Sequence, residues 1–247
     1  MMNDNHTIII LALNNHEITI SNINYLQYFN KGCKILLFDN GSNPNFKTFA
    51  KQKNIDYIRE KKNIYVNPAW NKIFDLVKTK YITLLNNDCY IISKNYFNDV
   101  LNHMDNNNIV LSSCKTFNVE NLNKFKLKMF EYYYNFNFHN KLRYTSRARR
   151  QGWIMTINLD VYKSLNYKIP EDFKIWYGDD WIWSQVARND LNYVIYKNRY
   201  AIHQKNQTIS NEKLTAVVEK DQFNFKANNS WVSNKIHIKS RLFNRYV

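Results

Sequence analysis

Two adjacent carboxylates, Asp179 and Asp180, follow one of only four glycines in the chain. The apolar residues after them recur at helical spacing, which predicts a helix over 179–190. Neighbouring side chains at a helix start point about 100° apart, so one aspartate can face a pocket while the other caps free N–H groups. A carboxylate held there suits a general base, and a capped helix without chemistry is the alternative.

Two further aspartates, Asp39 and Asp88, end apolar runs typical of buried strands. Asp39 is followed by Asn-Gly-Ser, in which glycine permits a tight turn with positive φ. Asp88 follows two asparagines, and a lone carboxylate with amide neighbours suits a divalent cation that takes its other ligands from a diphosphate. Taken alone, each aspartate is a typical turn residue.

Strand and helix patterns alternate along the first part of the chain. Such alternation predicts a mostly parallel α/β sheet with right-handed crossovers, in which ligands bind at the carboxyl ends of the strands. Asp39 and Asp88 both fall at that edge. The expected strands cover 7–15, 33–42, 54–60, 81–91, 108–114 and 191–204, with a strand and short helix over 152–165. The expected helices cover 18–29, 45–52, 68–80, 94–104 and 179–190, with a further candidate after 211.

The motifs resemble a known family when they are taken in order. They are the Asp39 turn, Asn63 and Asn71 around a helix start, the Leu-Asn-Asn-Asp strand end, and the late acid-Asp pair. This set resembles the GT-A glycosyltransferases of family 2, rhamnosyltransferase-like type, over residues 7–205. The resemblance implies a GT-A (Rossmann-like) domain over 1–210 with a basic insert at 115–150, then a basic helical extension over 211–247.

The resemblance also implies roles for individual residues. Asp39 would contact the base or ribose of a UDP- or dTDP-sugar, and Asp88, the aspartate of a degenerate DXD element, would hold Mn²⁺ or Mg²⁺. In an inverting reaction Asp180 would be the base and Asp179 its support. His203 matches a late histidine that reaches the metal or diphosphate, with a structural histidine as the alternative. The other implied donor-binding residues are Asn40, Asn63, Asn71, Asn87, Gly152 and Trp153.

Two features depart from this pattern or compete with it. The family has glycine where Tyr65 stands, and usually another at Ile73, and these departures bear on the identity of the donor. Tyr-Gly-Asp-Asp also occurs in polymerase palms, where it lies in a β-hairpin beside a strand bearing two carboxylates. The strand ending at Asp88 offers one, so the transferase interpretation is preferred.

The charge is concentrated in two segments. The chain carries +15, and residues 115–150 and 197–247 each hold an excess of seven basic residues, which leaves +1 elsewhere. Such clustering predicts a polyanionic partner, with lysine-rich coding from an AT-rich genome as the alternative. Aromatic residues interleave with the cations of the first segment, a pattern typical of nucleic-acid binding. The candidate acceptor contacts are Lys141, Arg143, Arg147, Arg149 and Arg150.

Two acceptors and one non-enzymatic function remain open. The first acceptor is DNA with hydroxymethylated bases, of the kind some viruses glycosylate, whose base would be flipped out. The second is a surface polysaccharide or lipid-linked glycan, with the basic segment on anionic headgroups. A catalytically inactive nucleic-acid-binding module is the third possibility.

The remaining composition indicates the compartment. No window of about 18 apolar residues exists, so no transmembrane segment is expected and membrane contact would be peripheral. The apolar run at 7–15 reads as a strand rather than a signal peptide. Cys33, Cys89 and Cys114 lie far apart without metal-binding spacing, which favours a reducing cytoplasm, the host's if the protein is viral.

Overall fold

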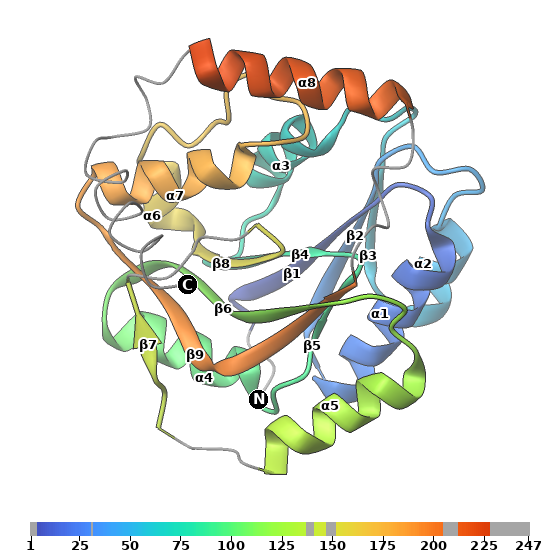
Figure 1. Cartoon of the computed structure of the whole chain (residues 1–247), viewed down its shortest axis with the longest axis vertical. Coiled ribbons are helices and arrows are strands. Elements are labelled where there is room, and N and C mark those ends of the chain that lie inside the picture. Colours follow the sequence, from blue (N-terminus) through green and yellow to red (C-terminus); the bar gives the residue numbers. More distant parts are fainter. Residues whose placement is uncertain (1–3, 31, 137–140, 147–151, 205–211, 228–247) are drawn as a thin grey trace.

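The structure, a computed structural model, describes residues 4–30, 32–136, 141–146, 152–204 and 212–227. Its strands form one sheet in the order β3-β2-β1-β4-β8-β6-β9-β5, with β7 beside β9 (Figure 1). The strands are β1 (His6–Ala12), β2 (Lys34–Asp39), β3 (Asp56–Arg59), β4 (Tyr81–Asn86), β5 (Cys89–Ile91), β6 (Ile109–Val119), β7 (Tyr144–Thr145), β8 (Ile154–Asn158) and β9 (Asn192–Gln204). The helices are α1 (His16–Phe29), α2 (Lys47–Lys53), α3 (Val66–Leu76), α4 (Tyr96–Asn106), α5 (Lys124–Phe136), α6 (Leu159–Lys163), α7 (Gly178–Arg188) and α8 (Glu212–Ala227).

The predicted mostly parallel sheet is confirmed. β1 pairs in parallel with β2 and β4, β2 with β3, and β6 with β9. β5, β7 and β8 run antiparallel to their neighbours. The carboxyl ends of β1, β2, β4, β6 and β9 therefore meet at one edge, where the sequence places Asp39 and Asp88.

Helices cover both faces of the sheet (Figure 1), with α3, α6, α7 and α8 on one face and α1, α2, α4 and α5 on the other. Residues of β1 alternate between these layers, because successive strand side chains point to opposite faces. Ile9 packs against α3, while Ile8 and Ile10 pack against α1. Both faces are buried, which explains why these strands are apolar runs rather than alternating patterns.

The late part of the chain resolves one alternative. The acid pair lies in the first turn of α7, not in a β-hairpin, so the polymerase interpretation is wrong. The basic insert begins within β6 and continues as α5, a helix that the sequence analysis did not predict.

Residues 228–247 lie outside the described part of the chain, and the division into 1–210 and 211–247 stays a prediction. Among the described residues, no helix combines the length and apolar composition needed to cross a bilayer.

Candidate active site

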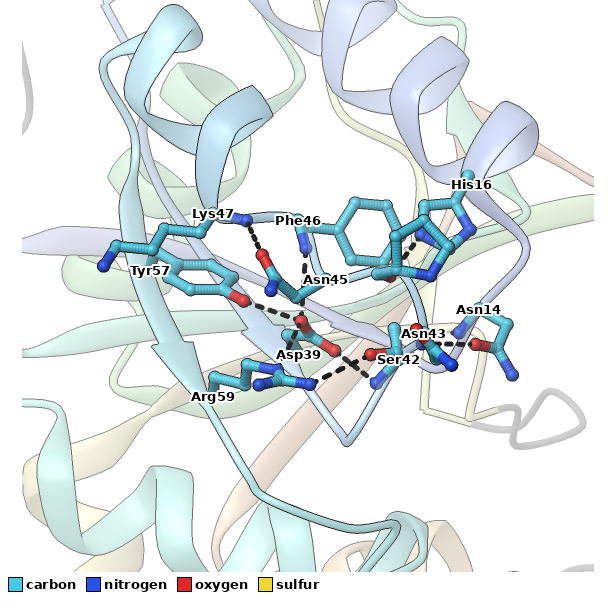
Figure 2. Close-up of polar contacts among 11 residues, drawn as sticks. Asn14, His16, Asp39, Ser42, Asn43, Asn45, Phe46, Lys47, Tyr57 and Arg59 are labelled. Carbon is cyan, nitrogen blue, oxygen red and sulfur yellow. Dashed lines mark hydrogen bonds and ion pairs between the residues drawn. The ribbon is translucent and has the colours of Figure 1, made fainter.

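Asp39 ends β2 and organises the loop that follows it (Figure 2). Its side chain is 0% exposed. One carboxylate oxygen accepts the backbone N–H of Ser42 at 2.8 Å, and the other accepts the Tyr57 hydroxyl at 2.7 Å and the backbone N–H of Phe46 at 3.3 Å. Arg59 Nε lies 3.5 Å away. These contacts give Asp39 the role of holding a loop, and its direct contact with a nucleotide stays a prediction.

The charge of Asp39 depends on these partners. Burial alone would raise the pKa of its carboxyl, but the hydrogen bonds from Tyr57, Ser42 and Phe46 outweigh burial and lower it. Asp39 is therefore ionised in the folded protein at neutral pH.

Amide side chains join this loop to the start of α3. Asn40 Nδ2 donates to Asn63 Oδ1 at 3.0 Å and to the carbonyl of Tyr65 at 3.1 Å, while Asn40 Oδ1 accepts the N–H of Ile64 at 3.0 Å. A Cβ on Gly41, at φ +91°, would lie 2.6 Å from the backbone of residue 62. The predicted donor-binding residues Asn40 and Asn63 thus bond each other and the backbone.

Tyr65, which stands where the family has glycine, keeps a glycine-like backbone. It precedes α3 with φ 68° and ψ 178°, a region that is costly for any residue with a Cβ. This turn therefore has a strained conformation that glycine adopts readily and tyrosine does not.

This strain predicts the order of two variants. Both Tyr65→Gly and Tyr65→Ala lose the ring, but only glycine relieves the backbone. The glycine variant is expected to exceed the alanine variant in free energy of unfolding by about 1 kcal/mol. Urea unfolding measures the difference, and an alanine variant of equal or greater stability would show that the turn is unstrained.

Two asparagines tie α3 to the segment before α7. Asn71 uses both polar atoms on the backbone of Ile169, at 2.8 Å each, so its donor contact stays a prediction. Asn67 is buried, donates to the carbonyl of Trp176 at 2.9 Å and lies where a Cβ on Gly178 would be, at 2.0 Å. Gly178 is thus the residue that lets α7 start against α3.

Asp221 of α8, which the sequence analysis missed, fixes the same segment. Its buried carboxylate accepts three consecutive backbone N–H groups, from Lys174 at 2.9 Å, Ile175 at 2.7 Å and Trp176 at 2.9 Å. Phe225, one turn later, stacks on Tyr177 with ring centroids 4.1 Å apart. A signal existed: Val218, Asp221 and Phe225 share one face of a helix, which places an acid among buried apolar residues.

Asp221→Asn is expected to lower the free energy of unfolding by about 2 kcal/mol, because an amide cannot accept all three N–H groups of a buried loop. The matched control is Glu219→Gln, an exposed acid on the same helix, for which a change within about 0.5 kcal/mol is expected. Urea unfolding of both variants measures this, and equal stabilities would contradict a bracing role for Asp221.

Asp88 and His203 come together at the carboxyl edge of the sheet. Asp88 Oδ1 is buried without a hydrogen-bond partner among the described residues, and His203 Nε2 lies 3.4 Å from it. His203 Nδ1 is 3.0 Å from Asn118 Oδ1, an acceptor, so the neutral ring with its proton on Nδ1 would turn the Nε2 lone pair toward Asp88. An unpartnered carboxylate oxygen beside an imidazole lone pair fits a divalent cation.

The turn that carries Asp88 is held from α1. Asn22 Nδ2 lies within 3.2 Å of the carbonyls of Asn86, Asn87 and Cys89, and Asn87 donates to Thr19 at 2.9 Å. Asn22 was not predicted, although an asparagine on the apolar face of α1 is a readable signal. The described residues contain no group of three or more His, Cys, Asp or Glu side chains able to hold a metal, so a cation here would take further ligands from elsewhere.

Gly152 and Trp153 link this pair to α7. The Trp153 ring stacks on His203 with centroids 4.6 Å apart and an interplanar angle of 18°. A Cβ on Gly152, the preceding residue, would lie 2.7 Å from Asp179 Oδ2. Asp179 thus lies against Gly152, and the next residue, Trp153, lies against His203, the neighbour of Asp88. The sequence analysis had selected both Gly152 and Trp153.

Asp179 has a raised pKa of about 7, first because its carboxyl is withdrawn from water and second because Asp180 is negative. Hydrogen bonds from the backbone N–H groups of Asp179 and Asp180 partly oppose the rise. Asp179 therefore changes between its protonated and ionised forms near neutral pH, whereas an ordinary aspartate is fully ionised there.

This pKa predicts how stability changes with pH. Between the ordinary pKa of 3.8 and about 7, folded Asp179 holds a proton that the unfolded chain has lost, so stability falls as pH rises through this window. Asp179→Asn cannot ionise, so its free energy of unfolding should rise relative to wild type between about pH 5 and about pH 8. Urea unfolding at both values tests this, and a constant difference would contradict it.

The predicted acceptor residues are only partly described. Arg147, Arg149 and Arg150 lie outside the described residues. Lys141 and Arg143 bond through their backbones to the Asn198 side chain, at 2.9 Å each. Asn198 precedes His203 by five residues and lies where the pairing of β9 with β6 jumps from Tyr196 to Tyr200. The contact of Lys141 and Arg143 with β9 is therefore separate from the Asp88 site, and their role toward an acceptor stays a prediction.

Solved structures share this fold. GalNAc-T7, crystallised with UDP, GalNAc and Mn²⁺, aligns with a TM-score of 0.63 and 12% identity over 87% of this chain and 48% of that one. TarS 1–349 from S. aureus aligns with a TM-score of 0.58 and 14% identity over 81% and 58%. The mannosyltransferase PcManGT from Pyrobaculum calidifontis, with GDP-Man and Mn²⁺, aligns with a TM-score of 0.60 and 9% identity over 83% and 58%. The chain thus spans about half of each relative, and the predicted GT-A fold is confirmed.

Sequence comparison identifies the family. No protein of curated function matches the chain. Residues 7–172 match the family description "Glycosyl transferase family 2", a match that ends before α7, so the role of the acid pair rests on the geometry above. The match covers most of the chain and all but the last parallel strand of the sheet. The rhamnosyltransferase-like type stays a prediction. The match shows that the chain belongs to glycosyl transferase family 2.

Proposed function

We propose that this protein transfers a sugar from a nucleotide-sugar donor to an acceptor hydroxyl, with inversion at the anomeric carbon and with Mn²⁺ or Mg²⁺. The observation that carries the proposal is the contact of Gly152 with Asp179 and of Trp153 with His203. It joins the acid pair of α7, through Asp179, to a candidate metal site at the edge where α/β folds bind ligands. Relatives of the same fold were crystallised with UDP or GDP-mannose and Mn²⁺.

Asp88 and His203 are the residues that would hold the cation, through Oδ1 and Nε2. A bound cation would neutralise the negative charge that develops on the departing diphosphate. Trp153 covers one side of the His203 ring and limits the entry of water there. Asn22 keeps the Asp88 turn in place by its hydrogen bonds to the turn carbonyls.

Asp180 is the proposed base. The acceptor hydroxyl gives its proton to the Asp180 carboxylate while its oxygen bonds to the anomeric carbon and the bond to the diphosphate oxygen breaks. Asp179 would support Asp180 by taking up the proton that the crowded pair holds below about pH 7, which leaves Asp180 as the carboxylate that accepts the acceptor's proton. Asp221 and Asn67 hold the backbone that leads into this turn.

A donor panel tests the proposal. UDP-, dTDP- and GDP-sugars are incubated with the protein in Mn²⁺ or in EDTA, and nucleotide release is measured. Mn²⁺-dependent release from one donor supports the proposal. Mn²⁺-independent release, or none from any donor, would overturn it and favour the inactive binding module.

The acceptor is proposed to be polyanionic, and the two predicted classes are hydroxymethylated DNA and a lipid-linked or surface glycan. One observation favours the second class: α5, the helix of the basic insert, exposes a row of apolar side chains along its length, whereas its lysines are confined to its first two turns. Transfer of labelled sugar to each acceptor in parallel separates the two.

A further inference from the structure

α5 carries two apolar faces on opposite sides of one helix. Leu127, Phe130 and Tyr134 pack against a cluster that includes Tyr90 of β5 and Ile202 of β9. At about 100° per residue, these three positions centre on one side of the helix. This side accounts for the attachment of α5 to the protein.

The opposite side forms what we call the aromatic stripe. Its members are between 51% and 77% exposed, and their spacing confines them to an arc of about 100°. They are Phe125, Met129, Tyr132, Tyr133 and Phe136. An apolar row of this length on a surface marks an interaction site rather than chance exposure.

The stripe is presented rigidly. The Asn135 side chain makes two hydrogen bonds to the segment after β5. Its Nδ2 donates to the Ile92 carbonyl at 2.7 Å, and its Oδ1 accepts the Lys94 N–H at 2.9 Å. Tyr134 lies against Tyr200 with ring centroids 4.4 Å apart. The exposed rings therefore belong to a helix already fixed by its other side.

Cations surround the stripe. A cavity of about 440 Å³ lies between the end of the stripe and Tyr28 of α1, lined by Lys94 and Lys128 among others. α5 also carries Lys124 and Lys126 near its start, and its one acid, Glu131, takes a hydrogen bond from Tyr25 at 3.4 Å. Glu131 also lines this cavity, so the local surface combines exposed rings with a net excess of lysines over this one acid.

We infer that the aromatic stripe and its lysines bind the surface of an anionic lipid bilayer. Phenylalanine, methionine and tyrosine rows enter the interface between headgroups and acyl chains, and lysines beside them attract anionic headgroups. A single strand of nucleic acid would need cations spaced along the whole row to follow its phosphates. Here the cations of α5 lie in its first two turns, and the rest of the row is apolar or phenolic.

The location of α5 relates this surface to the candidate active site. Its inner face packs on Tyr90 and Ile202, which are next along the chain to Cys89 and His203. Only α5 itself therefore separates a bilayer held at its outer side from the strand pair β5–β9, which contains His203 and begins next to Asp88. This matches an acceptor carried by a membrane, but the binding inference does not depend on catalysis.

Co-sedimentation of the full chain with vesicles tests the inference. Vesicles of phosphatidylcholine alone are compared with equal parts of phosphatidylcholine and phosphatidylglycerol, at low and high salt. Wild type is expected to bind the anionic vesicles, more weakly at high salt. The triple variant Phe125→Ser, Tyr132→Ser, Phe136→Ser is expected to lose binding by about tenfold or more. Phe223→Ser, an equally exposed ring on α8 at 70%, is the matched control and should bind as wild type.

A second variant protects the test against misfolding. Lys94→Glu with Lys128→Glu leaves the rings intact and should abolish the preference for anionic vesicles. Wild type that ignores both vesicles, or a triple variant that binds like wild type, overturns the inference. Two other results also overturn the inference, provided that wild type does not bind vesicles. In the first, wild type is retained on single-stranded DNA and the triple variant is not. In the second, wild type sediments as a dimer and the triple variant does not. Nucleotide release by wild type is measured separately, so failure of membrane binding and failure of the proposed activity are distinguishable.

Discussion

Replacing Asp180 with asparagine is expected to lower kcat for sugar transfer by about 10²–10⁴-fold, because an amide cannot take the proton of the acceptor hydroxyl. Asparagine has nearly the shape of aspartate, and α7 is also held by Asn67, Gly178 and the loop bound to Asp221. The fold and the binding of UDP with Mn²⁺ should therefore persist. Initial rates at saturating donor give kcat, and calorimetry gives nucleotide affinity.

The matched control is Asp172→Asn, an exposed carboxylate in the segment before α7. It should retain the wild-type kcat. If Asp179→Asn loses activity while Asp180→Asn retains it, the two roles are exchanged. If neither variant loses activity, the base does not lie on this helix.

Asp88→Asn is expected to lower kcat/KM by about 10³-fold and to remove the Mn²⁺ dependence of nucleotide binding. The reason is local: Asp88 Oδ1 is the one carboxylate oxygen near His203 Nε2 that the described residues leave without a hydrogen bond. An amide oxygen carries no net charge and binds the cation more weakly. Titration of Mn²⁺ in the presence of UDP, followed by initial rates, measures both effects.

Asp56→Asn is the control for this experiment, because Asp56 is an exposed carboxylate paired with Lys34 at 3.6 Å at the opposite edge of the sheet. It should bind Mn²⁺ and react as wild type does. A variant at Asp88 that keeps its Mn²⁺ dependence would move the metal site elsewhere.

Local pattern was enough to predict the elements that hold the candidate site. β1, β2 and β4 are buried on both faces, so each is an apolar run that ends abruptly in polar residues. Asp39 and Asp88 could be placed at the carboxyl edge for that reason. The spacing of Trp181, Ile182 and Val186 similarly distinguished α7 from a hairpin.

Other features depend on the tertiary structure. α5 has apolar residues on two opposite sides, so it lacks the single periodic face that reveals a helix. The amides of Asn40, Asn63 and Asn71 suit a ligand as well as a backbone, and only the fold brings Ile169 and Tyr65 within their reach. The reversed direction of β8 leaves no trace in its local sequence.

The three hydrogen bonds at Asp221 make a joint between two segments that the sequence treats as separate. A displacement of α8 is transmitted through the Asp221 carboxylate to the backbone that enters the turn bearing Asp180. Substitutions within α8 therefore bear on the acid pair, and each has to be judged by its effect on turnover as well as on yield.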